Sequence, residues 1–454
     1  MLDLDRAARD IGAGRRGPNV SFGGVTTDSR QVAHGDLFVA LRGERHDGHA
    51  FVRQALDSGA VAAMVDDARA VADHAVPLIL VDDTLQALGR LAAAWRNRFT
   101  LPLVAVTGSN GKTTVKEMLA AILRAHVGED AVLATSGNLN NAIGMPLMLL
   151  RLRSHHRHAV LEMGMNHLGE IRYLTTLASP TAALVNNAGT AHIGELGSRE
   201  SIAQAKGEIY EGLAAGGVAL INADDDFAEY WRGLNRGRRV VDFGIAATAQ
   251  VRGSVAGDEL SVSTPRDQYR VRVPVPGLHN LRNALAACAA AYALEVPTAA
   301  VIRGFATFEG AKGRLQSKPG KAGARVIDDT YNANPDSMRA AIAVLAQAAP
   351  PRVLVMGDMG ELGGDAGRMH EELGVAAREA GIERLFTLGE LAARAAQAFG
   401  RGADAFQDLD ALCAQLIPLL SPASTVLVKG SRFMRMERVV NRLVDGAGAD
   451  EGGH

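Results

Sequence analysis

The chain has 454 residues, of which 47% are hydrophobic and 22% are charged, and its net charge is −2. This length suits about three domains of ordinary size, and the absence of a basic run argues against nucleic-acid binding. The longest apolar stretch, residues 284–294, is too short to span a bilayer, and the charged N-terminal sequence MLDLDRAARD is unlike a signal peptide. With two distant cysteines, Cys288 and Cys413, we expect a cytoplasmic protein with reduced thiols and no stable membrane insertion.

The first 82 residues predict short strands and helices without a phosphate-binding loop. The expected elements are a strand at 35–41, a helix at 50–59 and a strand at 62–65. After Asp83, one side of the next segment carries apolar residues at helical spacing: Leu85, Leu88, Leu91 and Trp95. We interpret this helix as the start of a second domain.

A phosphate-binding loop follows the apolar strand predicted at 101–106. The loop sequence TGSNGKTT has glycines that let backbone N–H groups approach phosphate oxygens, and it opens a helix whose N-terminus is electropositive. The strict pattern places its first glycine where Val106 stands, so this loop is a variant. The lysine can reach the β- and γ-phosphates, and the hydroxyl of either threonine can bind Mg²⁺. The predicted ATP-binding residues are Gly108, Ser109, Asn110, Gly111, Lys112, Thr113 and Thr114.

Strands alternate with helices through the middle of the chain, which predicts a mostly parallel sheet covered on both faces. The expected strands are 101–106, 159–163, 182–185 and 218–221. Ligands bind at the carboxyl ends of such strands, where Glu162 and the loop to His192 fall. Because Mg²⁺ prefers carboxylate oxygens, Glu162 is a candidate ligand.

Four other polar residues of the middle segment are ambiguous when each is taken alone. His192 has the pattern of a polar loop residue, and Lys206 that of a surface lysine on an amphipathic helix. Asn280 and Asn283 share one face at the start of an Ala-rich helix, where they could cap the helix or contact a nucleobase.

A second series of strands follows the Gly-rich turn at 310–314 and predicts a third domain at 313–454. Its strands are expected at 325–328, 352–356, 384–388 and 425–428, and its Gly-rich tail, 445–454, is expected to be disordered. Polar loops follow three of these strands, and Asn334 with Pro335 predicts a helix start. The candidate ligand-binding residues there are Asp328, Asp329, Tyr331, Asn332, Asn334, Asp358, Glu361, Lys429 and Arg432, the last two being cations suited to a carboxylate.

Taken together and in order, these motifs resemble the Mur ligase family over nearly the whole chain. The resemblance is carried by TDSRQVAHGDLFVAL, TGSNGKTTVKEML, TSGNLNNAIGMP, LEMGMNHLGEI, NNAGTAHIGELGS, AQAKGEIY, GLHNLRNALAA, DDTYNANPDSM, GDMGELG and VKGSRFMRME. It implies a three-domain α/β protein. The expected domains are a UDP-substrate-binding domain at 1–82, a central P-loop ATPase domain with a parallel sheet at 83–312, and a C-terminal Rossmann-like domain at 313–454.

The resemblance also implies an ADP-forming ligase of peptidoglycan precursor synthesis that uses ATP and Mg²⁺ and forms a peptide bond through an acyl phosphate. DDTYNANPDSM and GDMGELG point to the member whose substrates are UDP-N-acetylmuramoyl-tripeptide and D-alanyl-D-alanine. The implied site residues are Lys112 on phosphates; Thr114 and Glu162 on Mg²⁺; His192 and Lys206, the latter as a carbamate, on a second Mg²⁺; Asn280 and Asn283 on adenine; Arg314 with Asp328 or Asp329 on ATP; Thr27, Asp28, Ser29 and Arg30 on uridine; and Asn138 and Asn141 near the acceptor.

Two alternatives compete with this interpretation. Another ligase of the superfamily could add an amino acid to a UDP-muramyl peptide or glutamate to folate, although DDTYNANPDSM argues against it. A phosphate-loop ATPase or switch without ligase chemistry would need neither the first domain with its Asp-Ser-Arg motif nor a second Rossmann-like domain.

Overall fold

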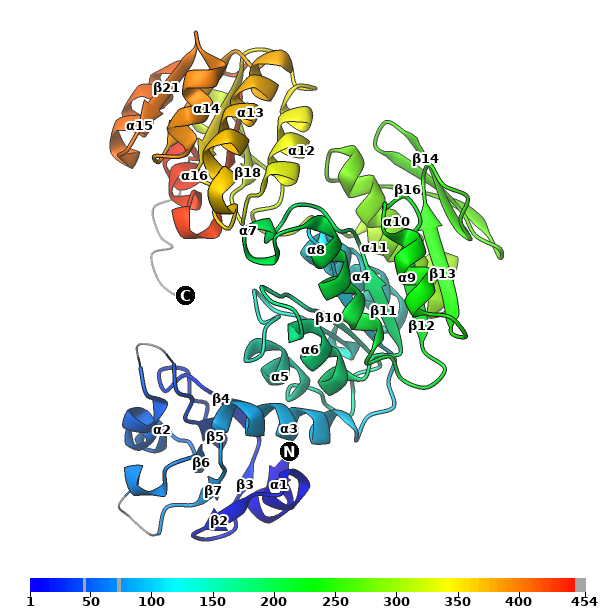
Figure 1. Cartoon of the computed structure of the whole chain (residues 1–454), viewed down its shortest axis with the longest axis vertical. Helices are drawn as coiled ribbons and strands as arrows, with labels where there is room; N and C mark the ends of the chain where they lie inside the picture. Colours follow the sequence, from blue (N-terminus) through cyan, green and yellow to red (C-terminus); the bar gives the residue numbers. More distant parts are fainter. Residues whose placement is uncertain (44–45, 72–74, 446–454) are drawn as a thin grey trace.

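The computed structural model describes residues 1–43, 46–71 and 75–445, and the strands of this part form four sheets. In Figure 1 the N-terminal segment lies at the bottom, the segment built on the largest sheet lies in the middle, and the C-terminal segment lies at the top. Of the tail predicted to be disordered, all but residue 445 falls outside the described ranges. No helix within those ranges is long and apolar enough to cross a membrane.

A five-stranded sheet of order β2-β7-β6-β5-β4 forms the N-terminal segment, and it is parallel except for the pair β2–β7. The helix predicted after Asp83 is α3, and the Asp83 side chain caps it by accepting a hydrogen bond from the Gln86 N–H. The elements are β1 (Leu2–Asp3), α1 (Leu4–Ile11), β2 (Gly14–Arg16), β3 (Ser21–Phe22), β4 (Gly24–Thr26), β5 (Asp36–Val39), α2 (Val52–Asp57), β6 (Ala62–Val65), β7 (Leu78–Leu80) and α3 (Thr84–Arg96).

The middle segment is built on a nine-stranded sheet of order β16-β15-β14-β13-β12-β11-β8-β10-β9. Its strands are β8 (Leu103–Thr107), β9 (Val132–Ala134), β10 (His158–Glu162), β11 (Ala182–Val185), β12 (Val218–Asn222), β13 (Arg239–Gly244), β14 (Val251–Ala256), β15 (Glu259–Ser263) and β16 (Gln268–Arg272). In this order, every neighbouring pair between β14 and β9, including those that involve β8, is parallel, as the βα alternation predicts. Strands β15 and β16 extend the sheet with antiparallel pairs.

Helices cover both faces of this sheet, so the central strand β8 is buried on both sides. Val104 and Val106 pack into one hydrophobic cluster, and Leu103 and Ala105 pack into another, because successive side chains point to opposite faces. The helices are α4 (Lys112–Val127), α5 (Gly144–Leu149), α6 (Glu170–Ala178), α7 (Ile193–Leu196), α8 (Arg199–Gly207), α9 (Ala228–Leu234), α10 (Leu278–Ala293) and α11 (Thr298–Ala306).

The C-terminal segment has a six-stranded sheet of order β17-β18-β22-β19-β20-β21, parallel except at β17. Its elements are β17 (Gln316–Pro319), β18 (Arg325–Asp329), α12 (Pro335–Leu345), β19 (Arg352–Gly357), α13 (Ala366–Glu379), β20 (Arg384–Leu388), α14 (Ala392–Phe399), β21 (Ala403–Phe406), α15 (Leu409–Leu416), β22 (Thr425–Lys429) and α16 (Glu437–Leu443). Loops that follow β18 and β19 contact loops that follow β8 and β11, so the carboxyl ends of the two parallel sheets meet at one site.

Candidate active site

The phosphate loop joins β8 to α4 and takes its shape from its glycines. Gly111 has a φ of +80°, and a Cβ there would collide with the amide oxygen of Asn283, so only glycine fits. The Lys112 ammonium donates to the carbonyl of Gly108 at 2.6 Å, which folds the side chain back over the loop. The N-terminus of α4 and this lysine together form an electropositive cradle suited to phosphate.

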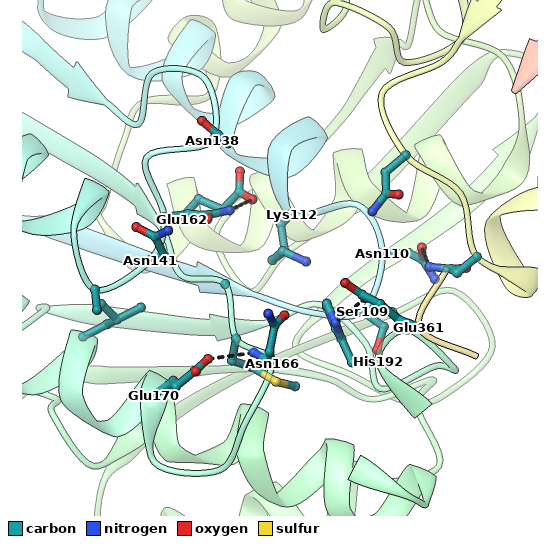
Figure 2. A pocket seen from close by; sticks show the side chains of 18 of the residues that line it. Ser109, Asn110, Lys112, Asn138, Asn141, Glu162, Asn166, Glu170, His192 and Glu361 are labelled. Atoms are coloured by element: carbon teal, nitrogen blue, oxygen red, sulfur yellow. Dashed lines mark hydrogen bonds and ion pairs between the residues drawn. The ribbon is translucent and has the colours of Figure 1, made fainter. Parts of the chain in front are cut away.

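A cavity of about 870 Å³ opens beside the loop and is walled by residues from both parallel sheets. Figure 2 shows Lys112 between Glu162 on one side and the pair His192 and Glu361 on the other. The predicted site residues that line the cavity are Ser109, Asn110, Gly111, Lys112, Asn138, Asn141, Glu162, His192, Arg314, Tyr331, Asn332, Asn334 and Glu361.

Glu162 ends β10, is almost fully buried, and faces the start of α4. Its carboxylate accepts hydrogen bonds from the Thr113 hydroxyl at 2.9 Å and from the Asn140 side-chain amide at 2.8 Å. The hydroxyl that meets Glu162 is therefore that of Thr113, whereas Thr114 was expected in this position. Adjacent helical residues point in different directions, and the Thr114 side chain is buried.

This donor set fits a magnesium ion. Within the described residues, no three His, Cys, Asp or Glu side chains are arranged as a complete metal cage. Mg²⁺ seldom uses such a cage, because it keeps several waters and takes substrate phosphates with one or two protein ligands. One carboxylate and one hydroxyl at the phosphate loop meet that need.

Lys206 lies near the end of α8 and is 1% exposed, so the interpretation of a surface lysine is wrong. Burial, and secondarily the charge of Lys112, holds the pKa of Lys206 well below its usual range. Among the described residues its ammonium has no hydrogen-bond or ion-pair partner. A buried amine without a counter-ion is costly when charged, which makes this lysine unusual.

His192 and Glu361 meet across the junction between the two sheets. The His192 Nδ1 atom lies 2.7 Å from the Glu361 carboxylate, an ion-pair contact whose angles are not those of a hydrogen bond. This histidine holds the pKa of Glu361 below its usual range. Both residues have positive φ, +65° and +61°, a conformation that non-glycine residues rarely adopt and that concentrates at functional sites.

Arg314 connects the C-terminal segment to the phosphate loop. Its guanidinium lies over the Tyr331 ring, 4.2 Å from the centroid, and donates to the Thr113 hydroxyl at 3.4 Å. A cation in this position can neutralise negative charge beside Glu162.

Several predicted binding residues instead have protein partners. Lys429 is buried in an ion pair with Asp329 at 2.6 Å, Asp328 pairs with Lys318 at 2.6 Å, and Asp358 accepts from the Ala392 N–H at the start of α14. Lys429 also donates to the Asn332 carbonyl at 2.9 Å, so these groups shape the loops that line the cavity.

Arg432 is exposed and pairs with Glu437. Lys429, Asp328, Asp329, Asp358 and Arg432 do not line the cavity.

Of the two asparagines at the start of α10, Asn283 lies against Gly111 of the phosphate loop. Asn283 accepts from the Asn186 amide at 2.9 Å, and Asn280 donates to the Pro276 carbonyl at 2.7 Å. Both side chains are buried in protein contacts and neither lines the cavity.

The Asp-Ser-Arg motif lies apart from this cavity, in the loop after β4. Asp28 forms a two-pronged ion pair with Arg30, and the Ser29 hydroxyl contacts Gln54 at 3.2 Å. The hydrogen bond from Arg30 lowers the pKa of Asp28. Thr27 directly precedes Asp28 in the same loop.

Three residues absent from the sequence prediction help to build the site. Asn140 holds Glu162, and Asn187 holds the phosphate loop by accepting from the Asn110 N–H at 2.9 Å. Asp336, in the first turn of α12, accepts from both the backbone and the hydroxyl of Thr190. Each lies within a motif quoted above, and only the position within the motif was missed.

Comparison with known proteins gives one consistent result. Three family models match: "Mur ligase family, catalytic domain" at 21–96, "Mur ligase middle domain" at 106–291 and "Mur ligase, glutamate ligase domain" at 313–432. The UDP-N-acetylmuramoyl-tripeptide–D-alanyl-D-alanine ligase of Escherichia coli (strain K12) is 41% identical over 94% of this chain and 95% of its own length. The enzyme of that name from Bacillus subtilis (strain 168) is 36% identical over 93% of each chain.

Solved structures agree with the sequence relatives. A crystal structure of MurF from Acinetobacter baumannii superposes with a TM-score of 0.90 at 38% identity, covering 97% of this chain and 98% of that one. MurF from Thermotoga maritima in complex with ADP gives a TM-score of 0.81 at 28% identity, covering 92% of this chain and 96% of that one. The chain belongs to the Mur ligase family.

Proposed function

We propose that this protein joins D-alanyl-D-alanine to the tripeptide carboxylate of UDP-N-acetylmuramoyl-tripeptide, at the expense of ATP, in peptidoglycan precursor synthesis. The observation that carries the proposal is the single cavity in which a phosphate loop and the polar loops of a second parallel sheet face each other. A simple phosphate-loop ATPase has no need of that second wall. Relatives that bear this activity in their names, and a structural neighbour with ADP, support the proposal.

The first half of the reaction is phosphoryl transfer between two anions. The loop from Gly108 to Thr113 binds the phosphates of ATP, and Lys112 and Arg314 offset the negative charge that gathers as the tripeptide carboxylate attacks the γ-phosphate. The products are an acyl phosphate and ADP. The acyl phosphate is an activated carbonyl that water would hydrolyse.

Thr113 and Glu162 would hold one Mg²⁺, and His192 with Lys206, the latter as a carbamate, would hold a second. When bound, Mg²⁺ supplies charge neutralisation and orientation for the phosphate oxygens. Lys206 is well placed for this modification, because a buried amine without an ion-pair partner becomes an anionic oxygen ligand once carbamylated.

The second half of the reaction is attack by the amine of D-alanyl-D-alanine on the activated carbonyl. A tetrahedral anion forms and collapses to the peptide bond as phosphate leaves. We assign acceptor binding to the cavity-lining residues of the C-terminal segment: Tyr331, Asn332, Asn334 and Glu361. Closure of this wall over the phosphate loop would exclude water from the acyl phosphate.

The remaining assignments complete the proposal. The segments 1–82, 83–312 and 313–454 are proposed as the UDP-substrate, ATP and dipeptide domains, with Thr27 to Arg30 near the uridine. Asn138 and Asn141 are proposed near the acceptor, and Asn280 and Asn283 on the adenine side of the nucleotide. We place the enzyme in the cytoplasm, where its nucleotide substrates are found, and link it to cell-wall biogenesis, cell shape and cell division.

The direct test is a product assay with ATP, Mg²⁺, UDP-N-acetylmuramoyl-tripeptide and D-alanyl-D-alanine. We expect the UDP-linked pentapeptide in amounts equal to ADP, and no ADP when either co-substrate is omitted. ADP release that ignores the co-substrates would identify an ATPase without ligase activity. Ligation of a single amino acid or of glutamate to folate would assign the chain to another branch of the family.

A further inference from the structure

Asp336 makes a close polar contact between the C-terminal segment and the loop that presents His192. Its Oδ2 atom accepts from the Thr190 N–H at 2.7 Å and from the Thr190 hydroxyl at 2.9 Å. The same oxygen fills the space beside Gly189, where a Cβ would collide with it. Two donors and a close fit around one carboxylate oxygen define a specific contact.

The contact reaches His192 through one tight turn. The Ile193 N–H donates to the Thr190 carbonyl at 3.2 Å, so Thr190 and Ile193 enclose the two residues between them. His192 is the second of these and has a φ of +65°. In Figure 1, α7, which follows His192, lies at the junction between the two segments. Displacing Thr190 would therefore displace the imidazole.

Glu361 of the C-terminal segment also contacts this loop, at His192 and at the Gly194 N–H, and the remaining contacts of its first residues come from its own segment. The Ala188 N–H donates to Asp225 at 2.9 Å, and the Gly189 N–H donates to the hydroxyl of Ser109 in the phosphate loop at 2.9 Å. Asp336 therefore adds a second fixed point, on the other side of His192 from Gly194, supplied by the segment that holds the acceptor. Two residues earlier, Asn334 donates to the Asn110 side chain of the phosphate loop at 2.8 Å.

We infer that Asp336 is a positioning residue of the ligase reaction: by holding Thr190 it sets the His192 loop, and it does so only when α12 is docked on the phosphate loop. This inference rests on the proposed function and deepens it. It makes phosphoryl transfer depend on the placement of the wall that binds the acceptor. A displacement of a catalytic group by about 1 Å can lower the reaction rate on the order of 10²-fold.

The first experiment compares Asp336→Ala, Asp336→Asn and Asp410→Ala in the full-length enzyme. We expect Asp336→Ala to lower kcat roughly tenfold or more, to leave the KM for each substrate within about threefold, and to raise the Mg²⁺ concentration needed for half-maximal rate. Asp336→Asn keeps an acceptor oxygen and should restore most of kcat. Asp410 is the matched control, since it occupies the same second position of its helix, α15, but among the described residues forms an ion pair only with Arg442.

The second experiment tests whether the effect passes through this contact. Gly189→Ala expels the Asp336 carboxylate, so it should lower kcat as Asp336→Ala does. In the double variant that combines Gly189→Ala with Asp336→Ala, the added methyl group no longer meets a carboxylate. Its kcat should therefore be no lower than that of Asp336→Ala alone. If the kcat of the double variant equals the product of the two separate losses, the inference is overturned. It is also overturned if Asp336→Ala keeps both the kcat and the melting temperature of wild type.

These outcomes are separable from failure of the proposed function. If wild-type enzyme forms no pentapeptide, the ligase assignment fails. If wild-type enzyme is active and Asp336→Ala is equally active, only the positioning role fails. Should Asp336→Ala melt at a much lower temperature, Asp336→Asn and Gly189→Ala, measured below their melting points, still decide the question.

Discussion

Lys112 is the residue on which the phosphoryl-transfer step depends most directly. Its ammonium lies over the phosphate loop, with Glu162 and Glu361 contributing opposing charge nearby. We expect Lys112→Ala to lower kcat roughly 10²-fold or more, as the loss of one preorganised electrostatic group does. The melting temperature should change little, because within the described ranges the side chain hydrogen-bonds only to its own loop. Steady-state kinetics decides: more than half of wild-type activity would remove the loop from the mechanism.

Lys206 tests whether a buried amine serves as a modified ligand. We expect Lys206→Ala to lose activity and to regain part of it when a short carboxylic acid is added, because the acid can supply the missing oxygen ligand. Mass spectrometry of native enzyme should detect the added carboxyl group in bicarbonate buffer. Full activity of Lys206→Ala in bicarbonate-free buffer would show that the lysine has only a packing role.

At the scale of elements, sequence patterns located the strands well, because each buried parallel strand is a short apolar run between turns. The predicted strands at 62–65, 182–185 and 384–388 coincide with β6, β11 and β20. The antiparallel extension by β15 was not predicted, since it depends on pairing between strands rather than on local pattern.

Side-chain partners were harder to predict than elements. Lys429 follows a strand just as a ligand-binding cation would, yet it is buried against Asp329, about a hundred residues away in the chain. Thr113 and Thr114 are chemically alike, and only the helix direction selects the one that meets Glu162. Motif composition therefore identified the loops of the site, while the geometry of packing assigned their members.

Strand β10 carries a titratable group whose effect on stability can be measured. Burial lowers the pKa of His158 from 6.5 to about 4, and its Nδ1 atom has no hydrogen-bond partner in the described structure. Between these pH values the unfolded chain binds a proton that the folded chain does not. The contribution to the free energy of unfolding is thus fully present above pH 6.5 and is lost as the pH falls toward 4.

We therefore expect His158→Leu to weaken the acid sensitivity of the fold. Urea unfolding at pH 7 and pH 4.5 gives the loss in free energy for each protein, and the loss should be smaller for the variant than for wild type. Titration of other histidines and carboxylates affects both proteins alike and cancels in the comparison. Equal losses would mean that His158 takes up its proton in the folded protein as readily as in the unfolded chain.

At the scale of the whole molecule, the account requires groups from two sheets to act on one substrate carboxyl group. The phosphate loop, Glu162 and Lys206 belong to the nine-stranded segment, whereas Arg314, Tyr331 and Glu361 belong to the C-terminal segment. Contacts such as Asn334 with Asn110 already join the two walls. This convergence explains why one chain carries two parallel sheets whose carboxyl ends face each other.

The most direct measurement follows oxygen atoms from the tripeptide carboxylate. If that carboxylate attacks the γ-phosphate, one of its two oxygens leaves with phosphate when the amine displaces it. UDP-N-acetylmuramoyl-tripeptide labelled with oxygen-18 in the reacting carboxylate should therefore give one labelled oxygen per phosphate released, with ADP as the nucleotide product. Label found only in the peptide product, or AMP and pyrophosphate as products, would contradict the acyl-phosphate ligase account.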